Sequence, residues 1–386
     1  MGRASKGCGC AIAVLAIVAG AAGFLGYRYV LPWWKTKPAP PTGELQVHVL
    51  DVGPGDGDAI LVISPTGKTV LIDTGDTGKD KVVLEALKRY KIQQLDYFIA
   101  THPHPDHIGA ATALIKAVKI LNVIDNGLPP VALPGASPAP VAGKAAAAAK
   151  TPARADKNRK SLAKFYDDYK NALELSSAHY ETAEVGRKYD LGGGARLTIL
   201  GPSQPYFSND QMKTGGNEPN ANSIVARLDY GDFSMLLAGD AEDQTEQRLL
   251  TKDLELRATI LKVAHHGSKY ATSETFLKRV QPEAAIISDG EWNRYGHPAQ
   301  SVLDRLKASN SKIYRTDLQG EITITTSGKL KGEKLYGIKT AKQAASDVWT
   351  GRPPQKDDAS RSGFIAYGDF GPPPKPANPK AVNRDK

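Results

Sequence analysis

The sequence predicts an α+β protein whose core is a sandwich of two β-sheets flanked by helices. Short runs of β-branched and aliphatic residues, separated by glycine-rich turns, are typical of strands that pair into a sheet. Such runs open the first half of the chain and return in the second, and alternating strands and helices follow them each time. Two series of this kind fit two sheets that pack face to face and carry helices on their outer faces.

The first half begins with alternating apolar and polar residues at 45–49, which predict a half-buried strand. A glycine-rich turn follows, and then two further apolar runs. The spacing of Val82, Val83, Ala86 and Leu87 predicts a helix over 79–90. The remaining elements expected in this half are strands at 59–63, 69–72 and 95–100 and a helix at 108–118.

The second half is expected to begin with a charged helix at 161–175. Sheet character then returns, and the strands alternate with helices toward the end of the chain. The expected strands lie at 195–200, 223–230, 233–238, 258–263, 284–288, 313–314 and 321–326, and the expected helices at 243–250, 273–280 and 299–309.

The 386 residues are enough for one large domain with additional segments. We expect a signal anchor or transmembrane segment at 1–34, a Pro/Gly linker at 35–43 and a folded domain at 44–345. An Ala/Pro/Lys-rich, low-complexity insertion at about 129–160 interrupts this domain, and the Pro/Lys-rich tail at 346–386 is expected to be disordered.

The N-terminus has the pattern of a membrane segment. Arg3 and Lys6 precede an apolar run at 11–31, which reaches about the 20 residues that span a bilayer. Trp33 and Trp34 follow it, as in the aromatic belt of a membrane helix. We expect an uncleaved, bacterial-type signal anchor that places the body outside the cytoplasm, and a cleaved signal peptide is the alternative.

The net charge indicates possible binding partners, and the positions of the cysteines exclude cysteine chemistry from the body of the protein. The formal net charge is +9, and lysine and arginine are concentrated near the two ends of the chain. A basic balance suits DNA or lipid headgroups, although basic tails are as often simply solvated. Cys8 and Cys10 are the two cysteines of the chain, so the body has neither a disulfide framework nor a cysteine nucleophile. The sequence identifies no protein partner.

The strongest chemical signal is the run His102-x-His104-x-Asp106-His107, directly after the predicted strand at 95–100. Imidazole suits zinc and related metals, and a carboxylate adds negative charge. Prolines between these residues stiffen the loop by fixing φ. The run therefore predicts a metal site at the end of this strand.

The run is similar to the His-x-His-x-Asp-His signature of the metallo-β-lactamase superfamily. Three further segments resemble superfamily motifs in the expected order: Leu-Ile-Asp-Thr-Gly at 71–75, Leu-Leu-Ala-Gly-Asp at 236–240 and Val-Ala-His-His-Gly-Ser at 263–268. The resemblance covers roughly residues 45–327 and implies a four-layer αββα sandwich.

Other details resemble the soluble domain of ComEC-type competence proteins, which act in DNA uptake. They are Leu-Asp-Val-Gly at 50–53, Asn-Ser-Ile-Val at 222–225, Tyr-Gly-His-Pro at 295–298 and Arg-Thr-Asp-Leu-Gln-Gly at 315–320. The multi-spanning channel of the full competence protein has no counterpart in this sequence, which argues against a transport role.

The resemblance implies a set of metal ligands. His102 and His104 would bind a first ion, and Asp106, His107 and His265 would bind a second, with Asp240 between the two.

Three residues have secondary or alternative roles. His266 would ligate in place of His265 or orient a ligand, and Asp73 is expected to support a ligand rather than be one. A further histidine of the superfamily is missing here, and Asn222 or Ser223 occupies the matching place. One ion or two, and Mn²⁺ as well as Zn²⁺, therefore remain open.

The expected mechanism follows from metal chemistry, in which bound water becomes hydroxide near neutral pH. Asp106 would orient or deprotonate that water. His297 is a candidate general acid or oxyanion donor, or else a histidine at the start of a helix. Basic residues expected to contact substrate phosphates are Lys269 and Arg294, with Lys262 and Arg315 as further candidates.

The resemblance and the ligand set together predict a metal-dependent hydrolase that uses metal-bound hydroxide on a phosphodiester, DNA being the expected substrate. One alternative is a metallohydrolase of a lactam, lactone or thioester. The other is a DNA-binding module without catalytic activity.

Overall fold

The computed structural model describes residues 41–55, 57–130, 153–208, 211, 218–291 and 295–352. All of them belong to the unit Ala39–Lys386. The expected membrane segment at 1–34 lies outside the described residues, as do most of the insertion and the end of the tail. Within the described ranges, no helix has the length and apolar character of a membrane span.

The predicted α+β architecture is confirmed. In the described part of the chain, the first sheet has eight strands in the order β15-β14-β1-β2-β3-β4-β5-β6. Strands β3 to β6 pair in parallel with one another, β2 pairs antiparallel with β3, and β1 pairs antiparallel with both β2 and β14. The strands are β1 (Leu45–Val49), β2 (Ile60–Ile63), β3 (Thr69–Ile72), β4 (Gln94–Ala100), β5 (Lys119–Asp125), β6 (His179–Thr182), β14 (Ile322–Thr326) and β15 (Gly337–Thr340).

The second sheet has seven strands within the described ranges, in the order β13-β12-β11-β10-β9-β8-β7. Strands β10 to β13 are parallel, and β7 to β10 are antiparallel. The strands are β7 (Lys188–Gly192), β8 (Ala195–Gly201), β9 (Val225–Tyr230), β10 (Phe233–Leu237), β11 (Ile260–Lys262), β12 (Ala284–Ile287) and β13 (Lys312–Arg315).

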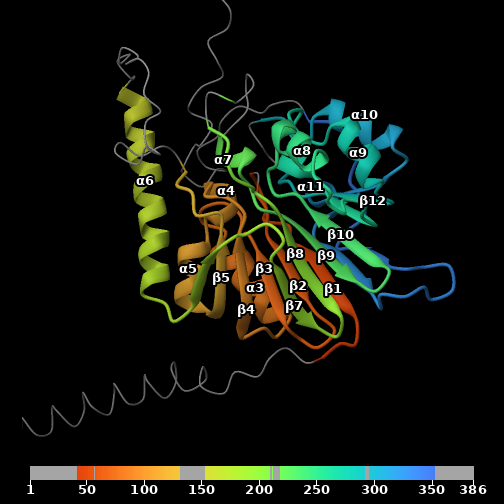
Figure 1. Cartoon of the computed structure of the whole chain (residues 1–386), viewed down its shortest axis with the longest axis horizontal. Coiled ribbons are helices and arrows are strands. Elements are labelled where there is room, and N and C mark those ends of the chain that lie inside the picture. Colours follow the sequence, from red (N-terminus) through yellow and green to blue (C-terminus); the bar gives the residue numbers. More distant parts are fainter. Residues whose placement is uncertain are drawn as a thin grey trace, which may run out of the picture. The chain divides into compact units, whose positions relative to one another are not determined.

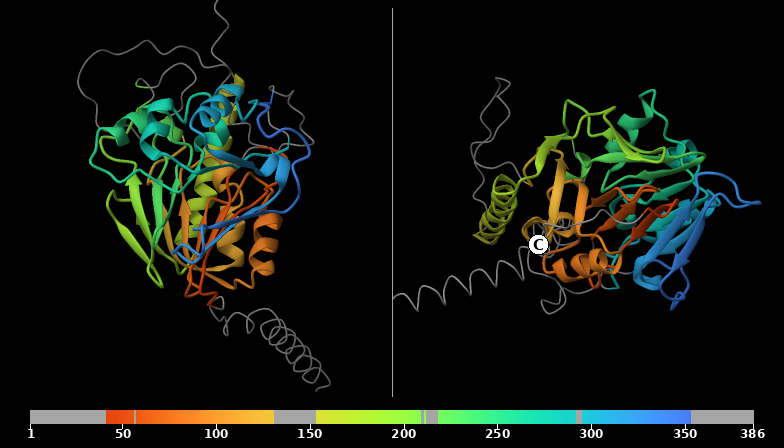
Figure 2. Two further views of the ribbon diagram at one scale, coloured as in Figure 1. Left: turned by 90° about the vertical axis from the view of Figure 1, so that its right-hand side faces the viewer. Right: turned by 90° about the horizontal axis from the view of Figure 1, so that it is seen from below.

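Helices cover the outer faces of both sheets (Figures 1 and 2). The first sheet packs against α3 (Asp80–Arg89), α5 (Ala111–Ala117) and α6 (Ala153–Glu174). The second packs against α8 (Asp243–Leu250), α9 (Glu274–Val280) and α10 (Gln300–Ala308). Shorter segments are α4 (Pro105–Ile108), α7 (Glu218–Ala221), η3 (Ala264–Gly267) and α11 (Thr316–Gln319).

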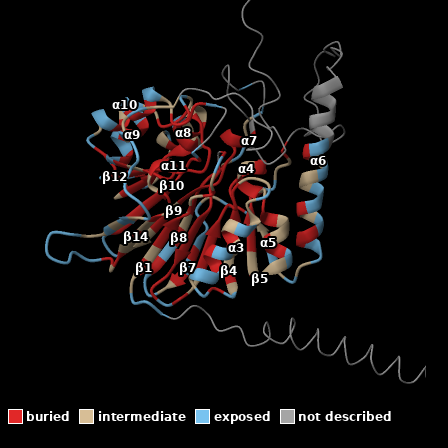
Figure 3. Cartoon of the chain, turned by 180° about the vertical axis from the view of Figure 1, so that it is seen from behind, coloured by how far each residue is buried: buried red, intermediate tan, exposed pale blue. Residues whose placement is uncertain are grey.

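Three hydrophobic layers hold these elements together. The central layer lies between the sheets and includes Val47, Ile99, Leu197, Phe233 and Ile286, which are all buried. Figure 3 shows the buried residues concentrated along the strands and on the inner faces of the helices. Burial of apolar surface contributes about 25 cal/mol per Å² to stability, so these layers hold the strands firmly in place. The polar side chains at the strand ends are therefore carried by a rigid framework.

The structure differs from the predicted elements in several places. Strands β5, β6, β7 and β15 are not among the predicted elements. The single helix expected at 108–118 is divided into α4 and α5 at Gly109, where an added Cβ would lie 2.1 Å from the Thr77 nitrogen. The folded body also continues into the expected tail, because the buried Arg315 guanidinium donates to the carbonyl oxygens of Val348 (3.0 Å) and Thr350 (2.7 Å).

Candidate metal centre

The predicted ligands come together at the carboxyl ends of parallel strands from both sheets. His102 to His107 follow β4, Asp240 follows β10, and His265 and His266 follow β11. The loops after these strands meet at the end of the sandwich where α4 and α7 lie (Figure 1). The site is therefore built by both halves of the chain.

Asp106, His107, Asp240 and His266 form the tightest group of potential ligands. Each offers one atom, and these atoms all lie within 4.8 Å of one another. His107 Nε2 lies 3.2 Å from Asp240 Oδ1 and 3.3 Å from His266 Nε2. His266 Nε2 lies 3.5 Å from Asp106 Oδ2. Two imidazoles and two carboxylates that converge in a buried pocket are donors of the kind that bind Zn²⁺, so the residues present fit a divalent ion.

A second set of histidines lies on the other side of Asp240. His102 Nε2 is buried, has no hydrogen-bond partner in the part of the chain that the structure describes, and lies 3.8 Å from Asp240 Oδ2. The rings of His102 and His104 are 4.4 Å apart, and both residues are buried. The two oxygens of Asp240 thus face different groups, Oδ1 toward His107 and Oδ2 toward His102.

The two neighbouring histidines of η3 diverge. The sequence favoured His265 over His266 as the partner of Asp106 and His107, but it is His266 that joins this group. His265 Nε2 instead lies 3.8 Å from Asp240 Oδ2. Both residues have positive φ, 50° and 53°, and their rings meet at 75° with centroids 6.1 Å apart. This unusual backbone points the two imidazoles at different parts of the site.

Hydrogen bonds from behind orient the ligands. Asp73 Oδ2 lies 2.7 Å from His107 Nδ1, and the same carboxylate accepts from the amide and hydroxyl of Thr101 at 2.8 and 2.7 Å. His266 Nδ1 lies 2.9 Å from the Ser288 carbonyl oxygen. Each contact occupies Nδ1 and leaves Nε2 directed at the other ligands, which is how metal-binding histidines are commonly held.

Asn222 has a different place from the one expected for a ligand. Its Nδ2 donates to the Phe207 carbonyl at 2.9 Å, and its Oδ1 accepts from the Phe207 amide at 2.9 Å. It therefore fastens the loop before α7. Two positions earlier, Asn220 lies with Nδ2 3.1 Å from His265 Nε2, while its buried Oδ1 has no hydrogen-bond partner within the described ranges. Asn220 is not among the predicted site residues, although it lies only two positions before Asn222.

Burial controls the protonation of the histidines at the edge of the group. It lowers the pKa of His104 to about 3 and that of His265 to about 4. Burial also lowers the pKa of His102 well below its usual value. All three rings are therefore neutral at neutral pH, the state in which imidazole binds a metal.

At His107, Asp106 and Asp240, interactions between charges outweigh the effect of burial on the pKa. Burial alone would lower the pKa of His107, but three carboxylates outweigh it and raise this pKa well above its usual value: Asp240, Asp73 and Asp106. Burial alone would raise the pKa of Asp106 and Asp240, but His107 and His266 outweigh it and lower both. The carboxylates thus favour the protonated form of His107, and the imidazoles favour the ionised forms of Asp106 and Asp240.

His297 lies beside the histidines of η3. Its ring centroid is 5.4 Å from that of His265 and 6.0 Å from that of His266. Tyr295 stacks on the His297 ring at 5.6 Å and 25°. The Tyr295 side chain is 42% exposed, so an aromatic surface extends from the candidate metal centre to the solvent.

The basic residues expected to contact substrate lie in different surroundings. Lys269 lines a cavity of about 330 Å³ next to the site, and Arg294 lies outside the described residues. The candidates Lys262 and Arg315 are fully buried, and pair with Asp58 and Asp317 at 2.7 Å. The expectation that they meet phosphates was wrong, because strands β11 and β13 turn their side chains into the interior.

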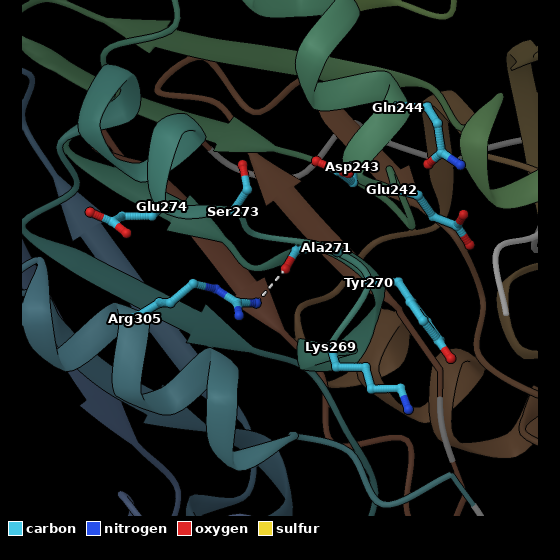
Figure 4. A pocket seen from close by; sticks show the side chains of 9 residues that line it. All are labelled: Glu242, Asp243, Gln244, Lys269, Tyr270, Ala271, Ser273, Glu274 and Arg305. Carbon is cyan, nitrogen blue, oxygen red and sulfur yellow. Dashed lines mark hydrogen bonds between the residues drawn. The ribbon is translucent and has the colours of Figure 1, made fainter. Parts of the chain in front are cut away.

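The cavity that Lys269 lines has a mixed charge (Figure 4). Glu242 connects it to the ligands, since its Oε1 lies 3.8 Å from His265 Nδ1. Arg305 supports its floor by donating to the Ala271 carbonyl at 2.8 Å. The other lining residues are Asp243, Gln244, Tyr270, Ser273 and Glu274.

Comparison with known proteins agrees with these observations. Residues 52–164 match the family model of the Metallo-beta-lactamase superfamily. ComE operon protein 3 of Bacillus subtilis is 30% identical over 302 residues, which cover 73% of this chain and 33% of that protein. Recombination protein 2 of Haemophilus influenzae is 30% identical over 285 residues, covering 72% of this chain and 28% of that protein.

A third relative is Competence protein ComA of Neisseria gonorrhoeae. It is 26% identical over 317 residues, covering 81% of this chain and 36% of that protein. The chain thus spans about a third of the length of the curated relatives that it matches.

Proposed function

Because the chain carries a metallo-beta-lactamase superfamily domain and resembles competence proteins of the ComEC type, we propose that it is a metal-dependent hydrolase that cleaves phosphodiester bonds in DNA. The observation that carries the proposal is the position of Asp240. Its two oxygens face separate sets of histidines, as expected of a carboxylate between two metal positions. The names of the relatives support DNA as the substrate class.

Asp106, His107, Asp240 and His266 would hold one ion, and His102 and His104 would contribute to another. A divalent ion bound there supplies Lewis acidity, which lowers the pKa of water toward about 7 and polarises a phosphoryl oxygen. Zn²⁺ and Mn²⁺ both suit this donor set.

Two side chains of this protein have suitable positions for proton transfer. The side chain of Asp106 is 23% exposed whereas the other three members of its group are buried, so its carboxylate faces the side from which substrate and water arrive. We assign it to orient the attacking water and accept its proton. His297, at the rim, is assigned to donate a proton to the leaving oxygen.

The rim supports a nucleic acid as substrate. Tyr295 is exposed and stacks on His297, and base stacking on such a ring is tolerant of sequence. Lys269 and Glu242 line the same cavity, and Glu242 Oε1 lies 3.8 Å from His265 Nδ1. A single strand that crosses this rim would meet an aromatic face and a cation beside the ligands.

The test is cleavage of an end-labelled single-stranded oligonucleotide by the chain loaded with Zn²⁺ or Mn²⁺. We expect EDTA-sensitive cleavage that Asp106→Ala abolishes and the surface variant Asp168→Ala leaves unchanged. If the folded chain binds neither ion, the hydrolase proposal fails. If it binds an ion and hydrolyses a β-lactam but no DNA, only the substrate is wrong.

We also propose that residues 1–34 anchor the body outside the cytoplasm. The support is the order of positive, apolar and aromatic residues in a segment that lies outside the described part of the chain. A reporter that folds only outside the cytoplasm, fused after Lys386, should be active and should become inactive when residues 1–34 are removed. An inactive reporter on the complete chain, or a reporter that stays active after residues 1–34 are removed, would contradict the proposal.

A further inference from the structure

The His265-His266 pair resolves a shortage of ligands at the first metal position. Asn222 or Ser223 stands in this chain where the superfamily has a further histidine. The Asn222 side chain is bonded to the Phe207 backbone, and the Ser223 hydroxyl accepts from the Asp240 amide at 3.2 Å. His102 and His104 alone would leave a tetrahedral ion with too few protein donors. Any additional donor must lie near Asp240 Oδ2, the oxygen that faces His102.

We propose that the two histidines of η3 serve different ions, with His265 completing the first position and His266 the second. His265 Nε2 and His102 Nε2 lie at the same distance from Asp240 Oδ2, 3.8 Å. Two ligand atoms of one tetrahedral zinc lie about 3.4 Å apart, given metal–ligand bonds of about 2.1 Å. His266 Nε2 instead lies 3.6 Å from Asp240 Oδ1, on the side of His107.

The backbone of η3 explains how adjacent residues reach two positions. Successive positive φ angles at His265 and His266 turn the rings to an angle of 75°. Gly267 continues the same conformation with φ 83°, and an added Cβ there would lie 2.6 Å from Pro298 Cβ. Positive φ is energetically costly for a residue with a side chain, yet both histidines adopt it where the two sets of ligands separate. This strain is consistent with a role of the two rings in metal binding.

Asn220 offers a further donor to the first position. Asn220 is 3% exposed, and its buried Oδ1 has no hydrogen-bond partner among the described residues. Its amide nitrogen lies 3.1 Å from His265 Nε2, so a rotation of the amide brings the oxygen to the same place. An unpartnered buried carbonyl is costly, and coordination of an ion removes that cost. The first position then has His102, His104, His265, Asn220 and Asp240 around it.

The experiment counts ions per chain by native mass spectrometry after loading with Zn²⁺ and removal of the excess. Glycine replaces each histidine, because glycine adopts positive φ without strain and removes only the imidazole. The wild type should hold two ions, and His265→Gly and His266→Gly one each. Asp106→Ala, which affects the second position, identifies which ion remains.

Combined with Asp106→Ala, His265→Gly should leave no ion, whereas His266→Gly should still leave one. If the His265→Gly chain retains both ions, or if its combination with Asp106→Ala retains one, the two histidines do not divide the ions and the inference is overturned. A wild type that holds a single ion also overturns it. A second variant, Asn220→Leu, should lower the affinity of the chain only for the ion that His265→Gly removes.

This inference rests on the proposed metal dependence but not on the proposed substrate. A folded wild type without any ion would therefore overturn both. Two ions in a chain that leaves DNA intact would overturn only the substrate assignment, and the ligand division would stand. Circular dichroism of each variant shows that a lost ion does not result from unfolding.

Discussion

Asp73 supports His107 from the side opposite to the other ligands, with Oδ2 2.7 Å from Nδ1. The Asp73→Asn variant replaces this charged acceptor with an amide that holds the ring less strongly. Loss of such a supporting partner typically costs about 10- to 100-fold in metal affinity. We expect this decrease in Zn²⁺ affinity, measured by competition with a chromogenic chelator.

The matched control is Asp96→Asn. Asp96 accepts from the amide and hydroxyl of Thr69, at 2.8 and 3.1 Å, as Asp73 does from Thr101, but the part of the chain that the structure describes shows no imidazole bonded to it. This variant should lose some stability without a change in metal affinity. Equal metal affinities in the two variants would contradict the role of Asp73.

The Lys262–Asp58 pair gives a prediction about stability. Lys262 Nζ lies 2.7 Å from Asp58 Oδ2, and both residues are buried. Removing one partner of a buried ion pair leaves an uncompensated charge and costs about 3–5 kcal/mol. Lys262→Met should lower the free energy of unfolding by this amount in urea titrations.

Two companion variants isolate the charge. Adding Asp58→Asn to Lys262→Met should recover part of the loss, because the unpaired carboxylate is removed. Lys164→Met breaks an exposed pair with Asp168 and should leave stability unchanged. A loss in Lys262→Met that Asp58→Asn does not reduce would mean that packing, not charge, is responsible.

Tyr295 gives a prediction about nucleic acid binding. Stacking of a base on an aromatic ring contributes about 1–3 kcal/mol. In an Asp106→Ala background, which prevents cleavage, Tyr295→Ala should raise the Kd for a single-stranded oligonucleotide roughly tenfold. Tyr295→Phe should keep the wild-type Kd. The discriminating measurement is fluorescence anisotropy with an abasic strand of the same length. Tyr295→Ala should leave the Kd for the abasic strand unchanged, and an equal loss of affinity for both strands would refute stacking.

Tyr90 gives a prediction about alkaline pH. Burial, together with the hydrogen bond that its hydroxyl donates to Glu321, raises the pKa of Tyr90 to about 12. The unfolded chain loses this proton near pH 10, so the folded state holds more protons between these values. Stability from Tyr90 is therefore complete below pH 10 and is lost as the pH rises toward 12.

The measurement is the thermal midpoint at pH 9 and pH 11. Tyr90→Phe starts from a lower midpoint because it lacks the hydrogen bond, but it should lose less between the two pH values than the wild type does. An equal loss in both proteins would show that other groups cause the alkaline destabilisation.

The sequence predicts those parts of the site that are local in the chain. His102 to His107 lie within one loop, and their spacing alone indicates metal binding. The choice between His265 and His266 depends instead on two positive φ angles, which no residue preference of histidine signals. The burial of Lys262 depends on neighbouring strands that are distant in sequence.

The missed strands have a similar cause. Residues 119–125 follow α5 directly, without the Gly or Pro that usually separates elements. Strand β6 is mostly exposed at the edge of its sheet, so apolar alternation does not mark it. Gly109 interrupts a helical pattern only because the loop of Asp76 and Thr77 packs against it, a contact that periodicity does not reveal.

The division of the donors between two distant parts of the chain has a consequence for biosynthesis. His107 and His266 are 159 positions apart, so the ribosome releases the first histidines long before their partners. A nascent chain that ends before β11 offers an ion only a partial set of donors, which resembles a loose surface chelate. Stable metal capture therefore has to wait until the chain is synthesised and folded through η3, and the ion available to this protein is the one present where its second half folds.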